Sequence, residues 1–135
     1  MKEKINRVQE LQLELIKNMG FNSFNGDKVV KDLIRYKEFW EGVIMDREAG
    51  LSKKDIKRDF ISCIDLIKLR DISDDYWNVD TLFILSSRKD DEKLELLAKS
   101  WDADEVDWLT KKELGDTHDI GESPTNKKIL RVWWD

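Results

Sequence analysis

One stretch, residues 81–109, constrains the fold of this chain more than any other. It contains an apolar run at residues 81–85, an amphipathic segment at 90–101 and an alternating segment at 105–109. A short apolar run without alternation is typical of a strand covered on both faces, whereas alternation is typical of a strand with one solvent-exposed face. We therefore predict a central strand, a helix and a second strand, joined as a right-handed parallel crossover.

The predicted helix in this unit has clear end signals. Asp90 or Asp91 is suited to the N-cap, and the acidic first turn and Lys99 near the end both favour the helix dipole. Its predicted buried face consists of Leu94, Leu97, Ala98 and Trp101. A long loop is expected over residues 110–126. A third strand, Lys128 to Trp134, then places alternate side chains on opposite faces: Leu130, Val132 and Trp134 on one, Ile129, Arg131 and Trp133 on the other.

Helical spacing dominates the first 70 residues. The pattern predicts helices over about 2–19, 28–47 and 52–69, the second with Asp27 as its N-cap. The first has an apolar face of Ile5, Val8, Leu15, Ile16 and Met19, with Leu11 at its edge. The second has a face of Val29, Leu33, Tyr36, Trp40, Val43 and Ile44, and leaves Ile34, Phe39 and Met45 outside it. The third includes Cys63, which we interpret as a small buried hydrophobic residue.

These elements predict one α+β domain over residues 1–135. A helical half, residues 1–70, packs on a small sheet of about three strands in residues 71–135. The length suits a single domain, and 40% hydrophobic residues with six Trp suffice for a core. The single Cys rules out an intramolecular disulfide. With no apolar signal segment and no membrane-length apolar run, we expect a cytoplasmic protein with no membrane partner.

Charge differs between the two halves. Residues 1–70 carry 15 Lys and Arg against 12 Asp and Glu, a charge of +3, whereas residues 71–135 carry 9 against 17, a charge of −8. Such a difference can steer a charged partner, or it can average out where the halves interleave. A basic group at Lys53, Lys54, Lys57 and Arg58 is diluted by acids, and the acidic pI argues against nucleic acid as a partner.

The strongest motifs for chemistry are missing from the sequence. It has no Walker loop, dinucleotide glycine fingerprint, HExxH, CxxC or GxSxG motif. We therefore expect no catalytic residues, cofactor or resident metal, and favour an interaction protein over an enzyme. The chain resembles no family that its motifs identify.

A cluster of acids between two tryptophans is the leading candidate for a binding surface. It consists of Trp101, Asp102, Asp104, Glu105, Asp107 and Trp108. Acids at this spacing can share a divalent cation, form a solvated face, or attract a basic partner, and Trp is enriched at interface hot spots. We predict the last of these, a surface of the inhibitor or immunity type.

Two alternatives stay open. One is a small-molecule or metal site at the seam of helix and sheet, using Ser87 and Arg88 in the strand-to-helix turn and His118, the only histidine. The other is a self-associating structural protein, suggested by the second helix, which is apolar on two sides, and by the surplus of Trp.

Overall fold

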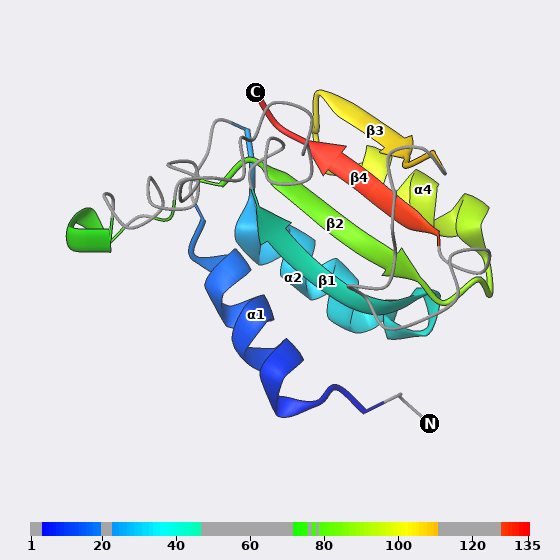
Figure 1. Cartoon of the computed structure of the whole chain (residues 1–135), viewed down its shortest axis with the longest axis horizontal. Coiled ribbons are helices and arrows are strands. Elements are labelled where there is room, and N and C mark those ends of the chain that lie inside the picture. The colour runs from blue at the N-terminus through cyan, green and yellow to red at the C-terminus, as the bar shows by residue number, and fades with distance from the viewer. Residues whose placement is uncertain (1–3, 20–22, 47–71, 76, 78, 111–127) are drawn as a thin grey trace, which may run out of the picture.

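The computed structural model describes residues 4–19, 23–46, 72–75, 77, 79–110 and 128–135. This part of the chain is mixed α+β, with three α-helices and a four-stranded antiparallel sheet (Figure 1). The helices are α1 (Arg7–Lys17), α2 (Gly26–Arg35) and α4 (Asp91–Lys99). The strands are β1 (Trp40–Asp46), β2 (Thr81–Ser86), β3 (Glu105–Trp108) and β4 (Ile129–Trp133). Two short 3-10 helices cover Lys37–Phe39 and Ile72–Asp74.

The predicted strand–helix–strand centre of the fold is present, but the sheet has four strands where about three were predicted. The strand order is β1-β2-β4-β3, so β2 is an inner strand, and all of its residues are buried except the half-buried Leu85. Both β2 and β3 run antiparallel to β4, so they are parallel to each other, as the crossover predicted. The prediction did not place β4 between them. Asp90 is the N-cap of α4, and its side chain accepts a hydrogen bond from the backbone N–H of Lys93.

The second predicted helix is wrong in its last third. Asn25, not Asp27, caps α2, and the helix ends at Arg35. Residues 40–46, predicted as helix, are strand β1, which pairs antiparallel with β2. Val43 and Met45 are buried whereas Ile44 between them is 48% exposed. This alternation has the period of a strand, but over so few residues it also fits the edge of a helical pattern.

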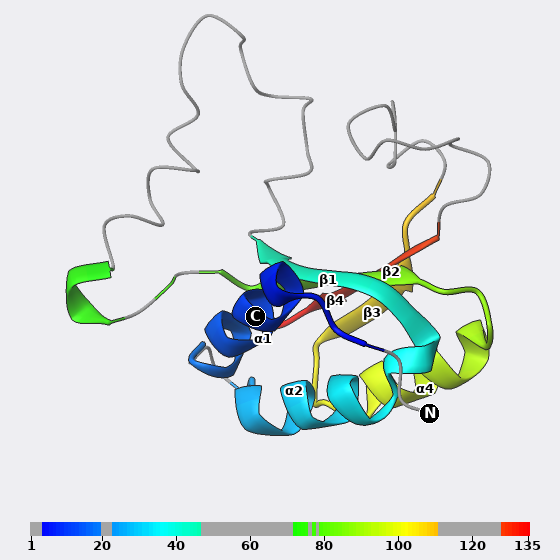
Figure 2. The ribbon, with the colours of Figure 1, turned by 90° about the horizontal axis from the view of Figure 1, so that it is seen from below.

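The apolar face predicted for the first helix is also wrong in part. α1 is shorter than predicted and buries Leu13 and Ile16, while Val8 is 73% exposed and Leu11 51%. Figure 2 shows α2 and α4 on one side of the sheet and α1 beside β1. A helix at the edge of a sheet buries a narrower stripe than one lying on its face, so several apolar residues of α1 remain exposed.

Close packing joins α1 to α2. A Cβ added at Gly26, the first residue of α2, would lie 2.6 Å from the backbone oxygen of Lys17. The start of α2 therefore approaches the end of α1 more closely than any residue with a side chain would allow.

The helix-facing side of the sheet forms the core, and tryptophans tie the layers together. Aligned rows of the sheet bring Val43, Ile84 and Leu130 side by side, and Met45, Leu82 and Val132 likewise. Four indole N–H groups donate across the core: Trp40 to the Leu33 oxygen, Trp101 to the Asp32 carboxylate, Trp108 to the Glu95 carboxylate and Trp134 to the Trp101 oxygen. Much of the surplus of tryptophan is therefore structural.

The faces of the last strand agree with the prediction. Leu130, Val132 and Trp134 are fully buried in the core, whereas Ile129 and Trp133 on the other face are half-buried. The predicted helix over 52–69, with Cys63 and the basic group at its start, lies outside the described residues. The predicted loop over residues 110–126, with His118, does so as well except for its first residue.

Candidate partner-binding surface

The predicted acidic cluster lies at one edge of the sheet. β3 pairs only with β4 among the described strands, so it is an edge strand. The turn before it contains Asp102 in a left-handed backbone conformation, with φ of 57°. This conformation is uncommon outside glycine but is tolerated by Asp and Asn. The carboxylate of Asp104 accepts a hydrogen bond from the Asp135 backbone N–H at 2.7 Å.

The structure does not bring the six predicted residues onto one surface. Asp102, Asp104, Glu105 and Asp107 are exposed, but Trp101 is only 2% exposed and belongs to the core. Its indole N–H donates to Asp32 at 2.9 Å, which fixes it against α2. Trp101 is therefore a packing residue in this conformation. Trp108 is half-buried and points to the helix side of β3, opposite to the side of Glu105 and Asp107.

Arg131 on β4 lies between the two acids of β3. Its guanidinium is 2.5 Å from the Glu105 carboxylate and 3.5 Å from that of Asp107. The side chain of Arg131 is 10% exposed, whereas those acids are about half exposed, at 54% and 52%. The guanidinium is thus largely buried beneath two carboxylates that face solvent, so the solvent-exposed charge at this position is negative.

Among the described residues, the backbone of β3 has no partner on its outer side. Leu109 donates to the Ile129 oxygen at 2.9 Å, which places alternate residues of β3 toward β4. In an antiparallel ladder the residues in between direct their N–H and C=O groups away from the partner strand. Val106 and Trp108 therefore direct these groups outward, and no described residue bonds to them there.

The opposite edge of the sheet is closed at the middle of β1. The side-chain amide of Gln9 on α1 donates to the Val43 oxygen at 2.9 Å and accepts from the Val43 N–H at 3.0 Å. One primary amide thus replaces the hydrogen bonds of a neighbouring strand at the middle of β1. No sequence pattern indicates this role, because a polar residue such as Gln9 is expected on the exposed face of an amphipathic helix.

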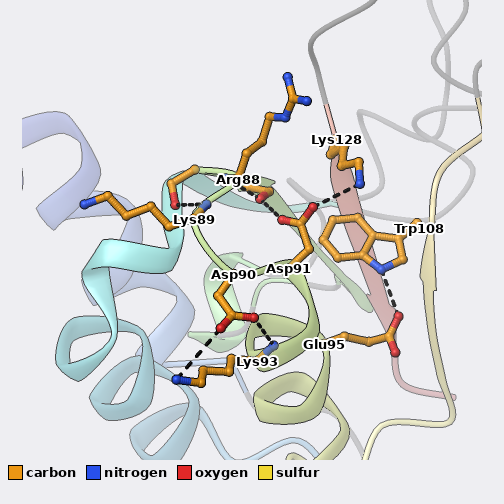
Figure 3. Close-up of polar contacts among 10 residues, drawn as sticks. Arg88, Lys89, Asp90, Asp91, Lys93, Glu95, Trp108 and Lys128 are labelled. Atoms are coloured by element: carbon orange, nitrogen blue, oxygen red, sulfur yellow. Dashed lines mark hydrogen bonds and ion pairs between the residues drawn. The ribbon is translucent and has the colours of Figure 1, made fainter.

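The strand-to-helix turn is organised by its own side chains. Figure 3 shows Arg88 and Lys89 beside the start of α4, and the Asp91 carboxylate in contact with Lys128. Ser86 donates to Asp91 and accepts from the Arg88 N–H at 2.8 Å, and the Lys128 ammonium lies 3.0 Å from Asp91. Burial by itself raises the pKa of Asp91. The bonds from Ser86 and Lys128 outweigh it, so the pKa falls below its usual value.

These contacts bear on the predicted ligand site at Ser87 and Arg88. The Ser87 hydroxyl donates to the Glu38 oxygen at 2.6 Å, which ties the turn to the 3-10 helix before β1. The Asp91 carboxylate occupies the position between the turn and Lys128 that an anion would need. His118 lies outside the described residues, so the structure does not test whether the three predicted ligand residues come together. Ligand binding at the turn stays a prediction.

A second network fastens β3 to α4. The Trp108 indole N–H donates to Glu95 at 2.8 Å, and Lys99 pairs with the other oxygen of the same carboxylate at 3.1 Å (Figure 3 shows the Trp108 contact). The bond from Lys99 is the largest cause that lowers the pKa of Glu95 below its usual value, with Trp108 adding to it against the effect of burial. The ion pair with Lys99 requires an ionised carboxylate, and the bond from Trp108 favours the same charged form.

Comparison with protein-family models, with curated proteins and with solved structures finds no match to this chain. Across the ranges that the structure describes, no three His, Cys, Asp or Glu side chains are placed to hold a metal ion. None of the helices in those ranges has the length and apolar character needed to cross a membrane.

Proposed function

We propose that this protein is a non-enzymatic interaction module of the inhibitor or immunity type, which binds a basic protein through the acidic surface of β3. We define the acidic surface as Asp102, Asp104, Glu105 and Asp107. The observation that supports the proposal is that four exposed carboxylates lie on this edge strand and its preceding turn, and that two of them, Glu105 and Asp107, pair with one largely buried arginine.

Electrostatics favours this use of the surface. A cluster of one sign raises the rate of encounter with an oppositely charged protein, and the effect falls as salt screens it. Arg131 holds two of the carboxylates in place, which reduces the side-chain entropy lost on binding. Trp108 contributes its half-buried ring to the other side of β3, while Trp101 supports the turn from within the core.

The test begins with a partner captured from native lysate and identified by mass spectrometry. Its association rate is then measured at low and high salt. The variant replaces the acidic surface by isosteric amides: Asp102→Asn, Asp104→Asn, Glu105→Gln and Asp107→Asn. Amide oxygens can still accept the bonds from Asp135 and Arg131, and Asn suits the left-handed turn. We expect association to slow by about tenfold or more at low salt, and the difference to shrink at high salt.

A matched control neutralises four exposed acids elsewhere: Glu14→Gln, Asp27→Asn, Glu41→Gln and Glu92→Gln. This control changes the net charge by the same amount as the surface variant. If it slows association as much as the surface variant does, the effect comes from total charge, and the proposed surface is refuted. Equal rates for wild type and surface variant would refute it as well. The proposal includes a cytoplasmic location, which fractionation of native cells tests.

A second candidate function is self-association through α1. Val8, Leu11 and Leu15 are 73%, 51% and 36% exposed and share one stripe of the helix at spacings of three and four. An exposed apolar stripe is a common docking face for another helix. Light scattering at two concentrations tests it: a mass that rises with concentration and is lowered by Leu11→Gln supports self-association, and a constant monomer mass refutes it.

A further inference from the structure

We propose that the basic partner binds as an added β-strand along the open edge of β3, with side chains that alternate between basic and apolar. This inference rests on the proposed function and specifies how the same surface is used. Its basis is that backbone groups with no partner among the described residues lie beside two chemically different faces of the same edge strand.

The backbone supplies the first part of the argument. Val106 and Trp108 each direct an N–H and a C=O outward, and no described residue satisfies them. An extended segment can pair with such groups and continue the sheet, as in recognition by strand addition. The strand has four residues, so it offers a ladder of about 13 Å, enough for a segment of roughly four to six residues.

The side chains supply the pattern. Glu105 and Asp107 stand on one face of β3, while Val106 and Trp108 stand on the face that packs toward α4. An added strand places alternate side chains beside each of these faces. Lys or Arg is favoured beside the two carboxylates, and an apolar residue is favoured beside Val106 and the Trp108 ring.

Charge also decides between a basic partner and a second copy of this chain. If two β3 strands paired edge to edge, Glu105 and Asp107 of one copy would lie opposite the same acids of the other. Like charges directly opposite one another destabilise a strand pair. The edge is therefore closed to self-pairing by the same carboxylates that attract a cationic strand.

The experiment uses the full chain and a defined probe. The probe is an acetylated and amidated peptide of about eight residues that alternates lysine and valine. The control peptide has the same composition with the lysines and valines in two blocks. Binding is measured by Trp fluorescence and by amide chemical shifts in NMR. We expect the alternating peptide to bind about tenfold more tightly than the block peptide. It should also change the chemical shifts of the Val106 and Trp108 amides.

Methylation of the peptide backbone identifies the binding mode. One peptide is N-methylated at every valine and another at every lysine, and in a strand only one of these sets directs its N–H groups toward β3. Antiparallel addition requires the valine set and parallel addition the lysine set. We expect one methylated peptide to lose binding by about tenfold or more and the other to keep it. Loss with both, or with neither, overturns strand addition.

A variant of the protein gives an independent readout. Val106→Pro removes an outward N–H and leaves the bonds to β4 in place, whereas Val106→Thr keeps the N–H and serves as the matched control. Binding should be lost with Pro and kept with Thr; equal binding to both overturns the inference. If the Pro variant fails to fold, the methylated peptides decide the question with the wild-type chain.

The two proposals fail separately. If both the alternating and the block peptide bind equally and only the amide variant of the acidic surface prevents it, the acidic surface stands and strand addition is refuted. If neither peptide binds at low salt, strand addition is again refuted. A captured basic partner that still depends on the acidic surface would then leave the proposed function intact.

Discussion

The two edges of the sheet meet the same physical demand in different ways. An edge strand leaves a row of N–H and C=O groups unpaired, and these groups can recruit another chain. At β1 a neutral side-chain amide, Gln9, satisfies the Val43 backbone from a packed helix. At β3 the outward groups of Val106 remain open among the described residues, and carboxylates flank them.

This difference shows which edge is built for stability and which is available for recognition. The contacts at β1 involve uncharged groups that are partly buried, so they depend little on salt or on pH near neutrality. The side-chain contacts that hold β3, from Trp108 to Glu95 and from Arg131 to its two acids, involve charged groups and are partly exposed. Substitutions at the two edges should therefore lower the free energy of unfolding by different amounts, and only those at β3 should depend on pH and salt.

The largest difference is expected between the tryptophans of the two edge strands. Trp40 begins β1 and is fully buried, with its indole N–H on the Leu33 oxygen. Trp40→Ala should lower the free energy of unfolding by about 3–5 kcal/mol, the usual cost of an aromatic deletion in a core. Trp108→Ala on β3 should cost roughly 1–2 kcal/mol, because its ring is half-buried. Urea unfolding measures both, and equal losses would contradict the comparison.

The next effect concerns the closed edge itself. Gln9→Ala should lower the free energy of unfolding by about 1–3 kcal/mol, because it leaves both Val43 groups without a partner in a partly buried position. Glu14→Ala, at an exposed site on the same helix, is the matched control and should change stability by less than about 0.5 kcal/mol. Equal stabilities of the two variants would show that Gln9 does not close this edge.

The smallest effect is a dependence on pH at the open edge. The pKa of Glu95 in the folded state is lowered below the usual value of 4.5, chiefly by the bond from Lys99. Its contribution to stability is therefore complete above that value and is lost as the pH falls through the lower folded-state pKa. In urea unfolding at pH 7, the wild-type protein should have a higher free energy of unfolding than Glu95→Gln. Near pH 3 this difference should disappear. A difference independent of pH would contradict this role.

Patterns within single elements predicted much of the fold. The central strand, the capped helix after it and the alternating strand β3 were all predicted because burial on two faces, capping and period two are local signals. The core face of β4 was predicted from the alternation of Leu130, Val132 and Trp134. These features depend on residues close together in the chain.

The errors arose where distant partners decide the structure. Trp40–Asp46 is a strand because β2 lies beside it, and no local signal shows that pairing. The exposed face of α1 follows from its place at the edge of the sheet. The acidic cluster was predicted as one surface, yet its aromatic members point inward because Asp32 and Glu95 accept their indole bonds across the core.

The central claim is that one edge of the sheet is closed and the other is open. Native-state hydrogen exchange of individual amides tests it most directly. The Val43 amide, bonded to Gln9, should exchange at least about tenfold more slowly than the Val106 amide, after correction for intrinsic rates. In Gln9→Ala the Val43 amide should become as fast as that of Val106. Equal protection of Val43 and Val106 in the wild-type protein would contradict the account.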